Sequence, residues 1–461
     1  MSEPTHLLRI DRLRLKNFRC FAACEVNLHP TLTILVAENA QGKTALLDAL
    51  RLALQEFVTT VDRGKQPRGF ERSDVHLKRG VQDEMESQLP TEFQVDGQVD
   101  GEPVSWSRVL GKDSFHARTS TKGTKHVRRV ATRLADRSDA NNGDPSDDQP
   151  TVLPVVAYYG TGRLYDEQRL TEGKRWLAEA SPARASAYLD CLSPPSSYKS
   201  FSAWFGQKWD QVSDPRFRAV GFDARPENHV TAVRDAVSTV LEPTGWTTIV
   251  WEPARPYHDG RTPRPGYIAL EHPQKGRLPL TRLSDGVRNM VALVGDLAHR
   301  CVRLNPFFGE HAAKKTPGIV LIDELEMHLH PLWQQLILAT LQTAFPHVQF
   351  VGTTHSPQVV TTVRSECLRI LKDGNIFAAP AGTDGAEAQR ILESVFQVST
   401  RPDTEMARML DKYLRMIDLR KWETPEALAL RARLDKWSQG QEPRLLDADL
   451  QIENIKWEEG K

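Results

Sequence analysis

The chain has 461 residues, a length that suggests two or three lobes or one long α/β domain with insertions. Its 60 basic and 60 acidic side chains cancel, so the whole chain has no electrostatic footprint for nucleic acid, and any such contact must be a local patch. No apolar stretch approaches the ~20 residues of a membrane span, the start MSEPTHLLRI is no signal peptide, and five scattered cysteines are typical of a reduced cytoplasmic protein. We therefore expect no membrane contact, and the composition argues against a transporter subunit.

The first 54 residues predict a strand, a phosphate-binding loop and a helix. Leu32–Ala37 is a short apolar run that indicates a buried strand, and Ala45–Leu54 has apolar residues at helical spacing. The loop between them, AENAQGKT, aims backbone N–H groups and the positive end of a helix at one point, which suits phosphate. The alternative is a chance GKT before a core helix. We predict that nucleotide is bound by Glu38, Asn39, Ala40, Gln41, Gly42, Lys43 and Thr44.

Two residues of this loop have specific predicted roles. Lys43 is expected to reach the β- and γ-phosphates, and the Thr44 hydroxyl is expected to ligate Mg²⁺. The pattern GxxxxGK[ST] is not fully met, because Ala37 stands where its first glycine would be. An alanine there cannot adopt a positive φ without a cost of roughly 1–2 kcal/mol.

The next hundred residues predict a small sheet, a polar insertion and a second buried strand. Thr91–Leu110 alternates apolar and polar residues around Asp-Gly pairs, which indicates an antiparallel hairpin beside the phosphate loop. The stretch near 111–150 is first basic and then acidic and Asn/Gly-rich, and it predicts a mobile insertion. Its basic run is either a solvated face or a DNA contact. Leu153–Tyr165 indicates a buried strand and turn, with Arg163 as a candidate phosphate or partner contact.

The middle of the chain predicts helices followed by strands. Glu167–Asp235 is helical in pattern but shows no sustained heptads, so a short helical lobe is expected in place of a long coiled-coil arm. The aromatic residues of Ser197–Trp209 are interpreted as core residues in preference to base-stacking ones. Strands are predicted at Thr247–Trp251 and Tyr267–Glu271.

The segment LSDG at Leu283–Gly286 opens an amphipathic helix, so a second helix N-terminus faces an anion. Taken alone, this segment is an ordinary N-cap. Because the phosphate loop already occupies one side of the nucleotide, we expect Ser284 and Gly286 to close over ATP held by a second copy of the chain. Two-fold symmetry then gives two equivalent ATP sites.

The clearest catalytic pattern lies at Ile319–Glu324, an apolar strand that ends in two carboxylates. Asp323 is predicted to hold Mg²⁺ through water, and Glu324 to orient and deprotonate the attacking water. A second strand, Val348–Ser356, delivers His355 to the same sheet edge, where a neutral imidazole can bind the γ-phosphate. The alternative is a pair of exposed acids that close a strand.

The tail after Ile376 predicts helices around Glu387–Phe396, Glu405–Ile417 and Pro425–Trp437. The last two form an amphipathic pair suited to docking on the rest of the chain or on another protein. No second cluster of spaced acids at strand ends follows the strand of His355, so we predict that the chain is not itself a nuclease.

Together these segments resemble an ABC-type AAA-family ATPase. Leu7–Leu50 resembles the opening of SMC-like and RecF-like ATPases, and IDELEMHLHPLWQQ with THSPQ resembles the prokaryotic ATPases that include the overcoming-lysogenization-defect proteins. The tail from Phe396 resembles the PtuA ATPases of Septu-type and retron-associated anti-phage systems. The resemblance implies an α/β, ABC-type P-loop head with a parallel core sheet, a lateral antiparallel sheet and a helical insertion. It also implies that Asn17 and Arg19 lie near the nucleotide, while alanine at 37 and 40 departs from the family's usual glycines.

These patterns predict a domain organisation and a function. The N-terminal half of the head is expected at 1–165, the helical insertion at 166–240, the C-terminal half at 241–378 and a helical tail at 379–461. We expect an ATPase that uses ATP and Mg²⁺, forms a homodimer or higher oligomer around ATP, and controls a separate HNH-type nuclease in anti-phage defence, with nucleic acid reached through the complex. One alternative is a RecF-like DNA-repair ATPase that binds DNA directly. Another is a nucleotide-bound scaffold that scarcely hydrolyses ATP.

Overall fold

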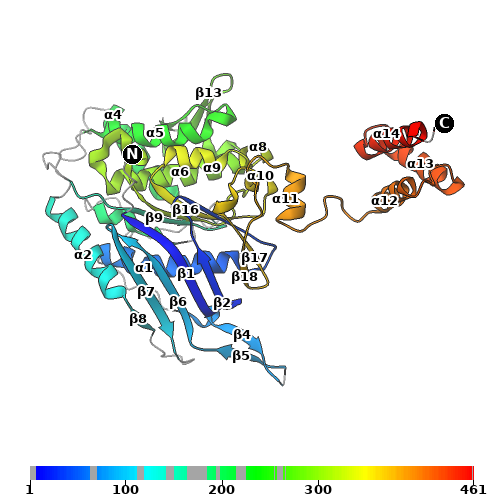
Figure 1. The fold of residues 1–461 in the computed structure, drawn as a ribbon. Helices are drawn as coiled ribbons and strands as arrows, with labels where there is room; N and C mark the ends of the chain where they lie inside the picture. Colours follow the sequence, from blue (N-terminus) through cyan, green and yellow to red (C-terminus); the bar gives the residue numbers. More distant parts are fainter. Residues whose placement is uncertain are drawn as a thin grey trace. The chain divides into compact units, whose positions relative to one another are not determined.

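The computed structural model describes two compact units, Met1–Phe396 and Gln397–Lys461 (Figure 1). The first unit therefore extends past residue 379, where the tail was predicted to begin. The described residues are 7–62, 70–81, 83–111, 119–141, 150–162, 184–193, 198–213, 225–253, 255–256, 263–264, 266–458 and 460.

The first unit is built on a six-stranded sheet with the order β18-β17-β3-β16-β15-β9. The five strands from β17 to β9 are parallel, and β18 pairs antiparallel at one edge. Every residue of β3, β9, β15 and β16 is buried, as expected for parallel strands covered on both faces. The strands are β3 (Leu32–Val36), β9 (Val155–Tyr159), β15 (Gly318–Ile322), β16 (Val348–Thr354), β17 (Leu368–Lys372) and β18 (Asn375–Ala378).

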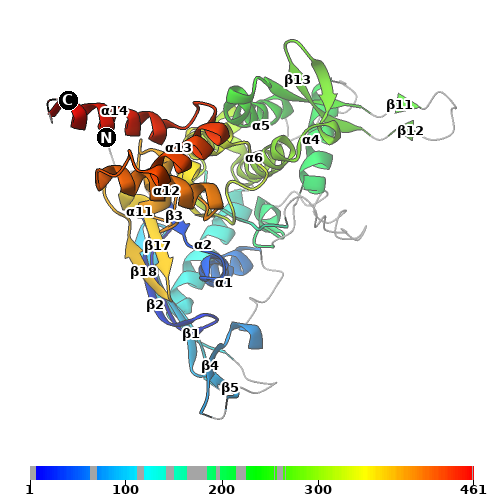
Figure 2. The same ribbon diagram turned by 90° about the vertical axis from the view of Figure 1, so that its right-hand side faces the viewer.

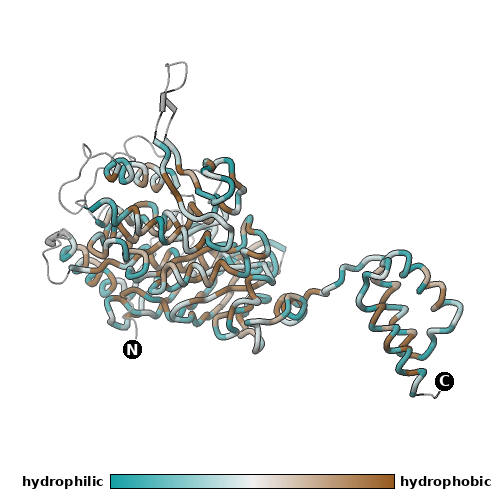
Figure 3. Tube along the Cα trace, turned by 90° about the horizontal axis from the view of Figure 1, so that it is seen from above, coloured by the Kyte–Doolittle hydropathy of each residue, from teal (hydrophilic) through white to brown (hydrophobic). Residues whose placement is uncertain are grey.

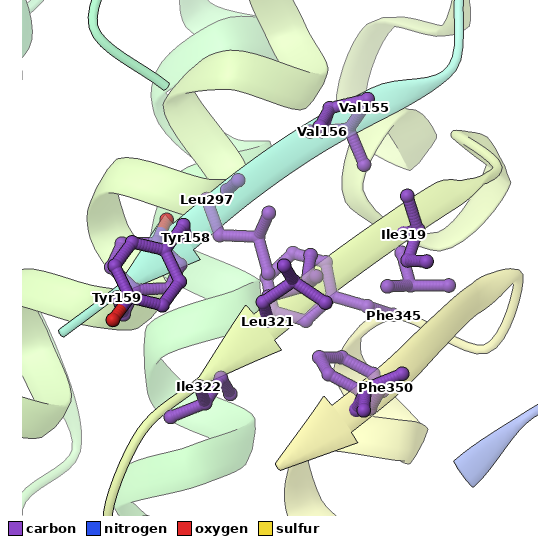
Figure 4. Packing of buried hydrophobic residues seen from close by; sticks show 14 of the residues in the cluster. Val155, Val156, Tyr158, Tyr159, Leu297, Ile319, Leu321, Ile322, Phe345 and Phe350 are labelled. Atoms are coloured by element: carbon purple, nitrogen blue, oxygen red, sulfur yellow. The ribbon is translucent and has the colours of Figure 1, made fainter. Parts of the chain in front are cut away.

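Helices cover this sheet and complete its core. Leu297 of α6, Leu321 of β15 and Phe345 are fully buried and lie together in the core (Figure 4). Helix α5 packs against α4, α6 and α9. Apart from α2 (Thr124–Asn141), which is described below, the helices of this unit are α1 (Lys43–Val61), α4 (Tyr198–Ser213), α5 (Pro226–Leu241), α6 (Asp285–Leu304), α7 (Ala312–Lys315), α8 (Pro331–Gln334), α9 (Ile337–Ala344), α10 (Pro357–Val360) and α11 (Ala388–Ser394). Short 3₁₀ turns are η1 (Arg72–Asp74), η2 (Arg184–Tyr188), η5 (Glu242–Thr244), η6 (Leu280–Arg282), η7 (Pro306–His311) and η8 (Ser365–Cys367).

A five-stranded antiparallel sheet, β2-β1-β6-β7-β8, forms the predicted lateral sheet (Figures 1 and 2). It is joined to α1 by a hydrogen bond from Trp106 Nε1 to the Ala53 carbonyl at 3.2 Å. It is joined to the core sheet by Gln349 of β16, whose Nε2 donates to the Ile10 carbonyl at 2.8 Å. The strands are β1 (Leu8–Phe18), β2 (Phe21–Asn27), β6 (Thr91–Val99), β7 (Glu102–Leu110) and β8 (Ser120–Lys122).

Three smaller pairings complete the first unit. Strands β4 and β5 form a hairpin that extends from the end of the lateral sheet, β10, β13 and β14 form a separate small sheet, and β11 pairs with β12 (Figure 2). The strands predicted near residues 247 and 267 are therefore confirmed. The strands are β4 (His76–Arg79), β5 (Met85–Gln88), β10 (Thr248–Glu252), β11 (Arg255–Pro256), β12 (Pro263–Arg264), β13 (Tyr267–His272) and β14 (Gly276–Pro279).

The stretch near 111–150 differs from the mobile insertion that we predicted. Its residues Thr124–Asn141 form helix α2, and Val130 and Leu134 of this helix are buried in the core. Arg128 of the basic run donates to the buried Glu56 carboxylate of α1 at 2.7 Å. The helix forms because apolar residues recur at helical spacing among the charges. Residues 112–118 and 142–149 lie outside the described part of the chain, as does Arg163.

The aromatic residues of the predicted helical insertion belong to the core. Phe201 and Phe205 of α4 are fully buried, and an added Cβ at Gly295 of α6 would lie 2.5 Å from the Phe201 ring. This close packing supports the core interpretation over base stacking. Residues 166–183 and 214–224 of the insertion lie outside the described residues.

The second unit has its own apolar core. Helix α12 contributes Leu410 and Ile417, α13 contributes Leu434, and α14 contributes Leu445 to this core. Apolar and hydrophilic positions alternate along its helices (Figure 3). Helix α14 was not predicted, because it is apolar on two faces and so shows no single period: it buries Leu445 while Leu446 is exposed. The helices are α12 (Glu405–Asp418), α13 (Pro425–Ser438) and α14 (Pro443–Glu458).

Within the residues that the structure describes, we find no helix that combines the length and the apolar character required to cross a bilayer.

Candidate nucleotide-binding site

The phosphate loop lies between β3 and α1, as its sequence predicts. Gly42 is the N-cap of α1 and has φ of 94°, in the region that favours glycine. An added Cβ at this position would lie 2.4 Å from Cys20 Sγ and 2.7 Å from the Phe21 ring, so a larger residue does not fit. The helix begins at Lys43, and its N-terminal N–H groups are available to an anion.

Lys43 folds back onto the loop that precedes it. Its Nζ donates to the carbonyls of Ala37 at 2.9 Å and Glu38 at 3.1 Å. Burial lowers the pKa of Lys43, and the nearby Asp323 and Glu324 carboxylates oppose this shift. The loop therefore holds a cation among backbone carbonyls, next to the free end of a helix, where phosphate binding is favoured.

The other loop residues differ in their surroundings. Glu38 and Asn39 are exposed, and the Gln41 side chain accepts a hydrogen bond from the Asp373 backbone N–H at 2.9 Å. Ala40 has φ of 63°, a left-handed conformation that costs about 1–2 kcal/mol for a residue with a Cβ. Of the two alanines that stand where the resembling ATPases usually have glycine, Ala37 does not have a positive φ and incurs no such cost, so the strain falls on Ala40 alone.

Hydrogen bonds join the phosphate loop to the ends of β15 and β16. The Thr44 hydroxyl donates to Asp323 Oδ2 at 2.9 Å, and the Thr353 hydroxyl donates to Asp323 Oδ1 at 2.6 Å. The Glu324 backbone N–H donates to the Thr353 hydroxyl at 2.8 Å. A hydroxyl and a carboxylate in contact are the oxygen donors that Mg²⁺ prefers, so Thr44 and Asp323 fit the predicted metal ligands.

Glu324 is held in an unusual backbone conformation. Its φ is 49°, and a left-handed conformation of this kind costs roughly 1–3 kcal/mol in a residue other than glycine. The side chain is half-buried and follows β15, whose residues are all buried. Strain of this kind is found at catalytic positions, where the surrounding structure maintains it.

His355 lies at the end of β16 and is half-buried. Burial lowers its pKa, and the positive charge of Lys43 lowers it further, so the imidazole is neutral at neutral pH. Its backbone N–H donates to Glu326 Oε1 at 2.5 Å, and the Thr354 hydroxyl donates to Glu326 Oε2 at 2.7 Å. Glu326 and Thr353 were not predicted as site residues, and the only sequence sign of Glu326 is its place in the acidic run DELE.

Ser284 and Gly286 lie apart from this hydrogen-bonded cluster. Helix α6 begins at Asp285, and its N-cap Ser284 is exposed and makes no side-chain capping bond. Gly286 packs so closely on the segment after β15 that an added Cβ would lie 2.4 Å from the His328 carbonyl oxygen. Among the hydrogen bonds of the described residues, none runs from Ser284 or Gly286 to the residues around Asp323.

Arg19, which the resemblance placed near the nucleotide, is bound to carboxylates of its own chain. Its guanidinium donates to Asp48 at 2.5 Å and to Asp74 at 3.0 Å. Asp48 lies on α1, so Arg19 fixes the turn after β1 against the phosphate-loop helix. Asn17, implied with it, donates from Nδ2 to the Pro90 carbonyl at 3.0 Å. In this arrangement Arg19 supports the helix that follows the phosphate loop, whereas Asn17 is bonded to the segment that precedes β6.

A cluster of a different kind lies where β3 and β17 begin, at the end of these strands away from the phosphate loop. Candidate ligand atoms of His29, Glu366 and Cys367 lie within 4.8 Å of one another. The Arg364 guanidinium lies 2.9 Å from the Glu366 carboxylate. Because a cation of the chain already compensates this carboxylate, the cluster does not compete with Thr44 and Asp323 as a site for a divalent ion.

Comparisons with known proteins identify the family of the chain. A family model described as "AAA domain, putative AbiEii toxin, Type IV TA system" matches residues 32–361, a range that includes the whole hydrogen-bonded cluster. The probable ATPase of retron Ec83 from Escherichia coli is 37% identical over 495 aligned positions, which cover 98% of this chain and 88% of that protein. The Septu protein PtuA of Bacillus mycoides (strain KBAB4) is 44% identical over 78 residues, 17% of this chain and 10% of that protein. The SMC head domain from Thermotoga maritima aligns with a TM-score of 0.41 at 14% identity, covering 81% of this chain and 100% of that one.

Proposed function

We propose that this chain, which belongs to the AAA-domain family described as putative AbiEii toxin, Type IV TA system, is an ATPase that dimerises around ATP and controls a separate nuclease in anti-phage defence. The family membership and the similarity to a probable retron ATPase support the ATPase activity. The dimer, the nuclease and a place in the cytoplasm are further parts of the proposal.

One observation carries the catalytic part of the proposal, namely the hydrogen bonds that join Thr44, Asp323 and the Glu324 backbone. Thr44 and Asp323 would hold Mg²⁺, which when bound offsets the negative charge of the phosphates. Lys43 would exchange its loop carbonyls for phosphate oxygens. Glu324 would accept a proton from the attacking water, and the neutral His355 would donate a hydrogen bond to the γ-phosphate.

The dimer follows from the position of the α6 N-terminus. Ser284 is exposed at the start of a 20-residue helix, and Gly286 fixes that start against the His328 carbonyl. A helix N-terminus attracts anions. We infer that this one completes the ATP site of a second copy, related by a two-fold axis.

The replacement Glu324→Gln tests the dimer and the catalytic base together. An amide keeps the size of the side chain but cannot take up the proton, so ATP should remain bound and hold the dimer together. Light scattering with Mg·ATP should show a dimer that the wild type loses as it hydrolyses its nucleotide. A variant that stays as monomeric as the wild type in ATP would refute the sandwich model.

The nuclease part of the proposal rests on the resemblance of the sequence to the ATPases of Septu-type and retron-associated anti-phage systems, and its relatives include a retron ATPase and a Septu protein. Our expectation is a separately encoded nuclease of the HNH type. The second unit is a candidate docking site, because Leu446, Leu450 and Trp457 on one face of α14 are exposed. A pull-down of the tagged chain with ATP should recover a stoichiometric nuclease, whereas recovery of DNA alone would favour a RecF-like repair function.

A second candidate function is a nucleotide-bound scaffold that scarcely hydrolyses ATP. The alanines at 37 and 40 favour it, because the ATPases that the sequence resembles usually have glycine at both positions, and Ala40 holds a left-handed φ of 63° at a cost of about 1–2 kcal/mol. Single-turnover hydrolysis of pre-bound ATP distinguishes the two. Complete turnover within minutes would exclude the scaffold.

A further inference from the structure

Glu326 is a carboxylate that the proposed chemistry does not use. It lies two residues beyond Glu324 and is half-buried. One carboxylate oxygen accepts the His355 backbone N–H at 2.5 Å, and the other accepts the Thr354 hydroxyl at 2.7 Å. The two oxygens of Glu326 thus bind two consecutive residues at the end of β16, Thr354 and His355.

These bonds fix the backbone on which the His355 imidazole is mounted. Thr354 is fully buried, and its hydroxyl also accepts the Ser356 backbone N–H at 3.0 Å. The residues before and after His355 are therefore both tied to one hydrogen-bonded group. Hydrogen bonds to a carboxylate are stronger than those between neutral groups, so Glu326 is the strongest constraint in this turn.

The segment that carries Glu326 also contacts the start of α6. The Asn289 side-chain amide donates to the Met327 carbonyl at 3.1 Å, and Gly286 packs on the His328 carbonyl. His328 has φ of 64°, so the chain turns sharply between these two contacts. One short segment thus connects the strand-end acids, the His355 turn and the helix that begins after Ser284.

We propose that Glu326 is a positioning residue that holds His355 where its imidazole meets the γ-phosphate, so that the site distinguishes ATP from ADP. This inference rests on the proposed ATPase function. It assigns Glu326 no contact with the nucleotide and no proton transfer. Its effect must therefore appear only with ligands that carry a γ-phosphate, because ADP does not reach His355.

The test compares the dissociation constants of Mg·AMP-PNP and Mg·ADP for the full chain by titration calorimetry. Wild type should bind AMP-PNP more tightly than ADP, and His355→Ala should lose this preference. Glu326→Ala should weaken AMP-PNP binding by roughly tenfold, the effect of one charge-assisted hydrogen bond, and leave ADP binding unchanged. Glu326→Gln keeps one acceptor oxygen, so its affinity for AMP-PNP should lie between those of the wild type and Glu326→Ala.

A double replacement separates positioning from a general loss of structure. If Glu326 acts through His355, a double variant with Glu326→Ala and His355→Ala should bind AMP-PNP no more weakly than the single variant His355→Ala. Thr354→Val keeps the shape of the buried side chain and the bond from the His355 N–H to Glu326, but it removes the hydroxyl that bonds both Glu326 and the Ser356 N–H, so it should also reduce the preference. Glu366→Ala removes an exposed glutamate at the other end of the sheet and is the matched control, with no expected change.

The outcomes distinguish this inference from the proposed function. A wild-type chain that binds neither nucleotide would overturn both. A wild type that prefers AMP-PNP, with a Glu326→Ala variant that keeps the preference, would overturn the positioning role alone. So would a variant that weakens ADP and AMP-PNP equally and also lowers the melting temperature, since that pattern indicates a structural role.

Discussion

The two halves of the candidate ATP site differ in how far one chain completes them. At the strand ends, Thr44, Asp323 and Glu326 are all hydrogen-bonded to residues of other elements. At the start of α6, Ser284 is exposed and its side chain makes no capping bond. The polar side chains of the first half are bonded to one another within one chain, whereas the second half has an exposed helix start.

This difference separates nucleotide binding from its consequence. The strand-end half has the Lys43 cation, the oxygen atoms of Thr44 and Asp323 and the carboxylate that we propose as the general base, so a single chain should bind Mg·ATP. The α6 half is fixed to the strand-end half through Gly286 and Asn289, which contact the segment after Glu326. Changes at the γ-phosphate can therefore reach the surface that we assign to the second copy. Replacements in each half test whether the two functions separate.

The largest expected effect is at Lys43, in the strand-end half. Lys43→Met keeps most of the apolar stem but removes the ammonium that donates two hydrogen bonds in the loop. Two charge-assisted bonds to phosphate should be lost, so the affinity for Mg·ATP should fall roughly a hundredfold. Titration calorimetry measures this change. An unchanged affinity would place the nucleotide elsewhere and would invalidate the comparison itself.

The next effect lies in the other half and should leave nucleotide binding intact. Ser284→Arg, made in the Glu324→Gln background, adds a bulky side chain at an exposed helix start. Dimer formation in ATP should weaken by at least about tenfold, while each chain still binds ATP as before. Light scattering and calorimetry measure the two quantities.

The control for Ser284 is Ser87→Arg, another exposed serine, on β5. It should alter neither quantity. If Ser284→Arg abolished ATP binding as well, Ser284 would belong to the same site as Lys43, and the two halves would not be separable.

The strand-end half could be predicted from the sequence because each of its parts is local. An apolar run followed by Asp323 and Glu324, or by His355, marks a strand end, and parallel strands bring their ends to one edge. The role of Glu326 could not be predicted in this way. It depends on the register of β15 against β16, which brings Glu326 to a residue 29 positions later in the chain.

Local patterns also left open which alanine is strained, missed helix α2 and did not reveal the partners of Arg19. Alanine replaces the usual glycine at both 37 and 40, and only Ala40 has a positive φ, because backbone torsions depend on how the loop packs, which a one-residue motif position does not record. Helix α2 is polar enough to resemble an insertion, yet its few apolar residues meet the core. The predicted contact of Arg19 with nucleotide competes with two carboxylates, Asp48 and Asp74, whose proximity only the fold establishes.

A smaller effect concerns the buried body of α6, in contrast to its exposed start. Both ring nitrogens of His299 are buried without a hydrogen-bond partner among the described residues, and the ring lies 4.5 Å from that of Trp204. Burial lowers the pKa of His299 well below its usual value, and the positive charges of Arg303, Arg300 and Lys208 add to this.

The sign of the pH dependence follows from that lowered pKa. Below about pH 6.5 the unfolded chain binds a proton at His299 that the folded chain does not, so folding stability should fall as the pH decreases. The loss should approach about 1.4 kcal/mol per pH unit. His299→Leu should reduce the difference between melting temperatures at pH 7.5 and pH 5.5. Equal differences in the variant and wild type would show that the ring is protonated in the folded chain.

The smallest expected effect returns to the phosphate loop and tests whether its strain matters for turnover. Ala40→Gly removes a left-handed penalty of about 1–2 kcal/mol but gives the unfolded chain more freedom, worth about 0.4–1 kcal/mol. The free energy of unfolding should rise by about 1 kcal/mol or less, and single-turnover hydrolysis should become faster. Ala37→Gly is the matched control, because a residue without a positive φ gains no relief and should only lose stability. If the two glycines had the same effect on hydrolysis, strain at Ala40 would not limit the rate, and the support for a slow scaffold would be removed.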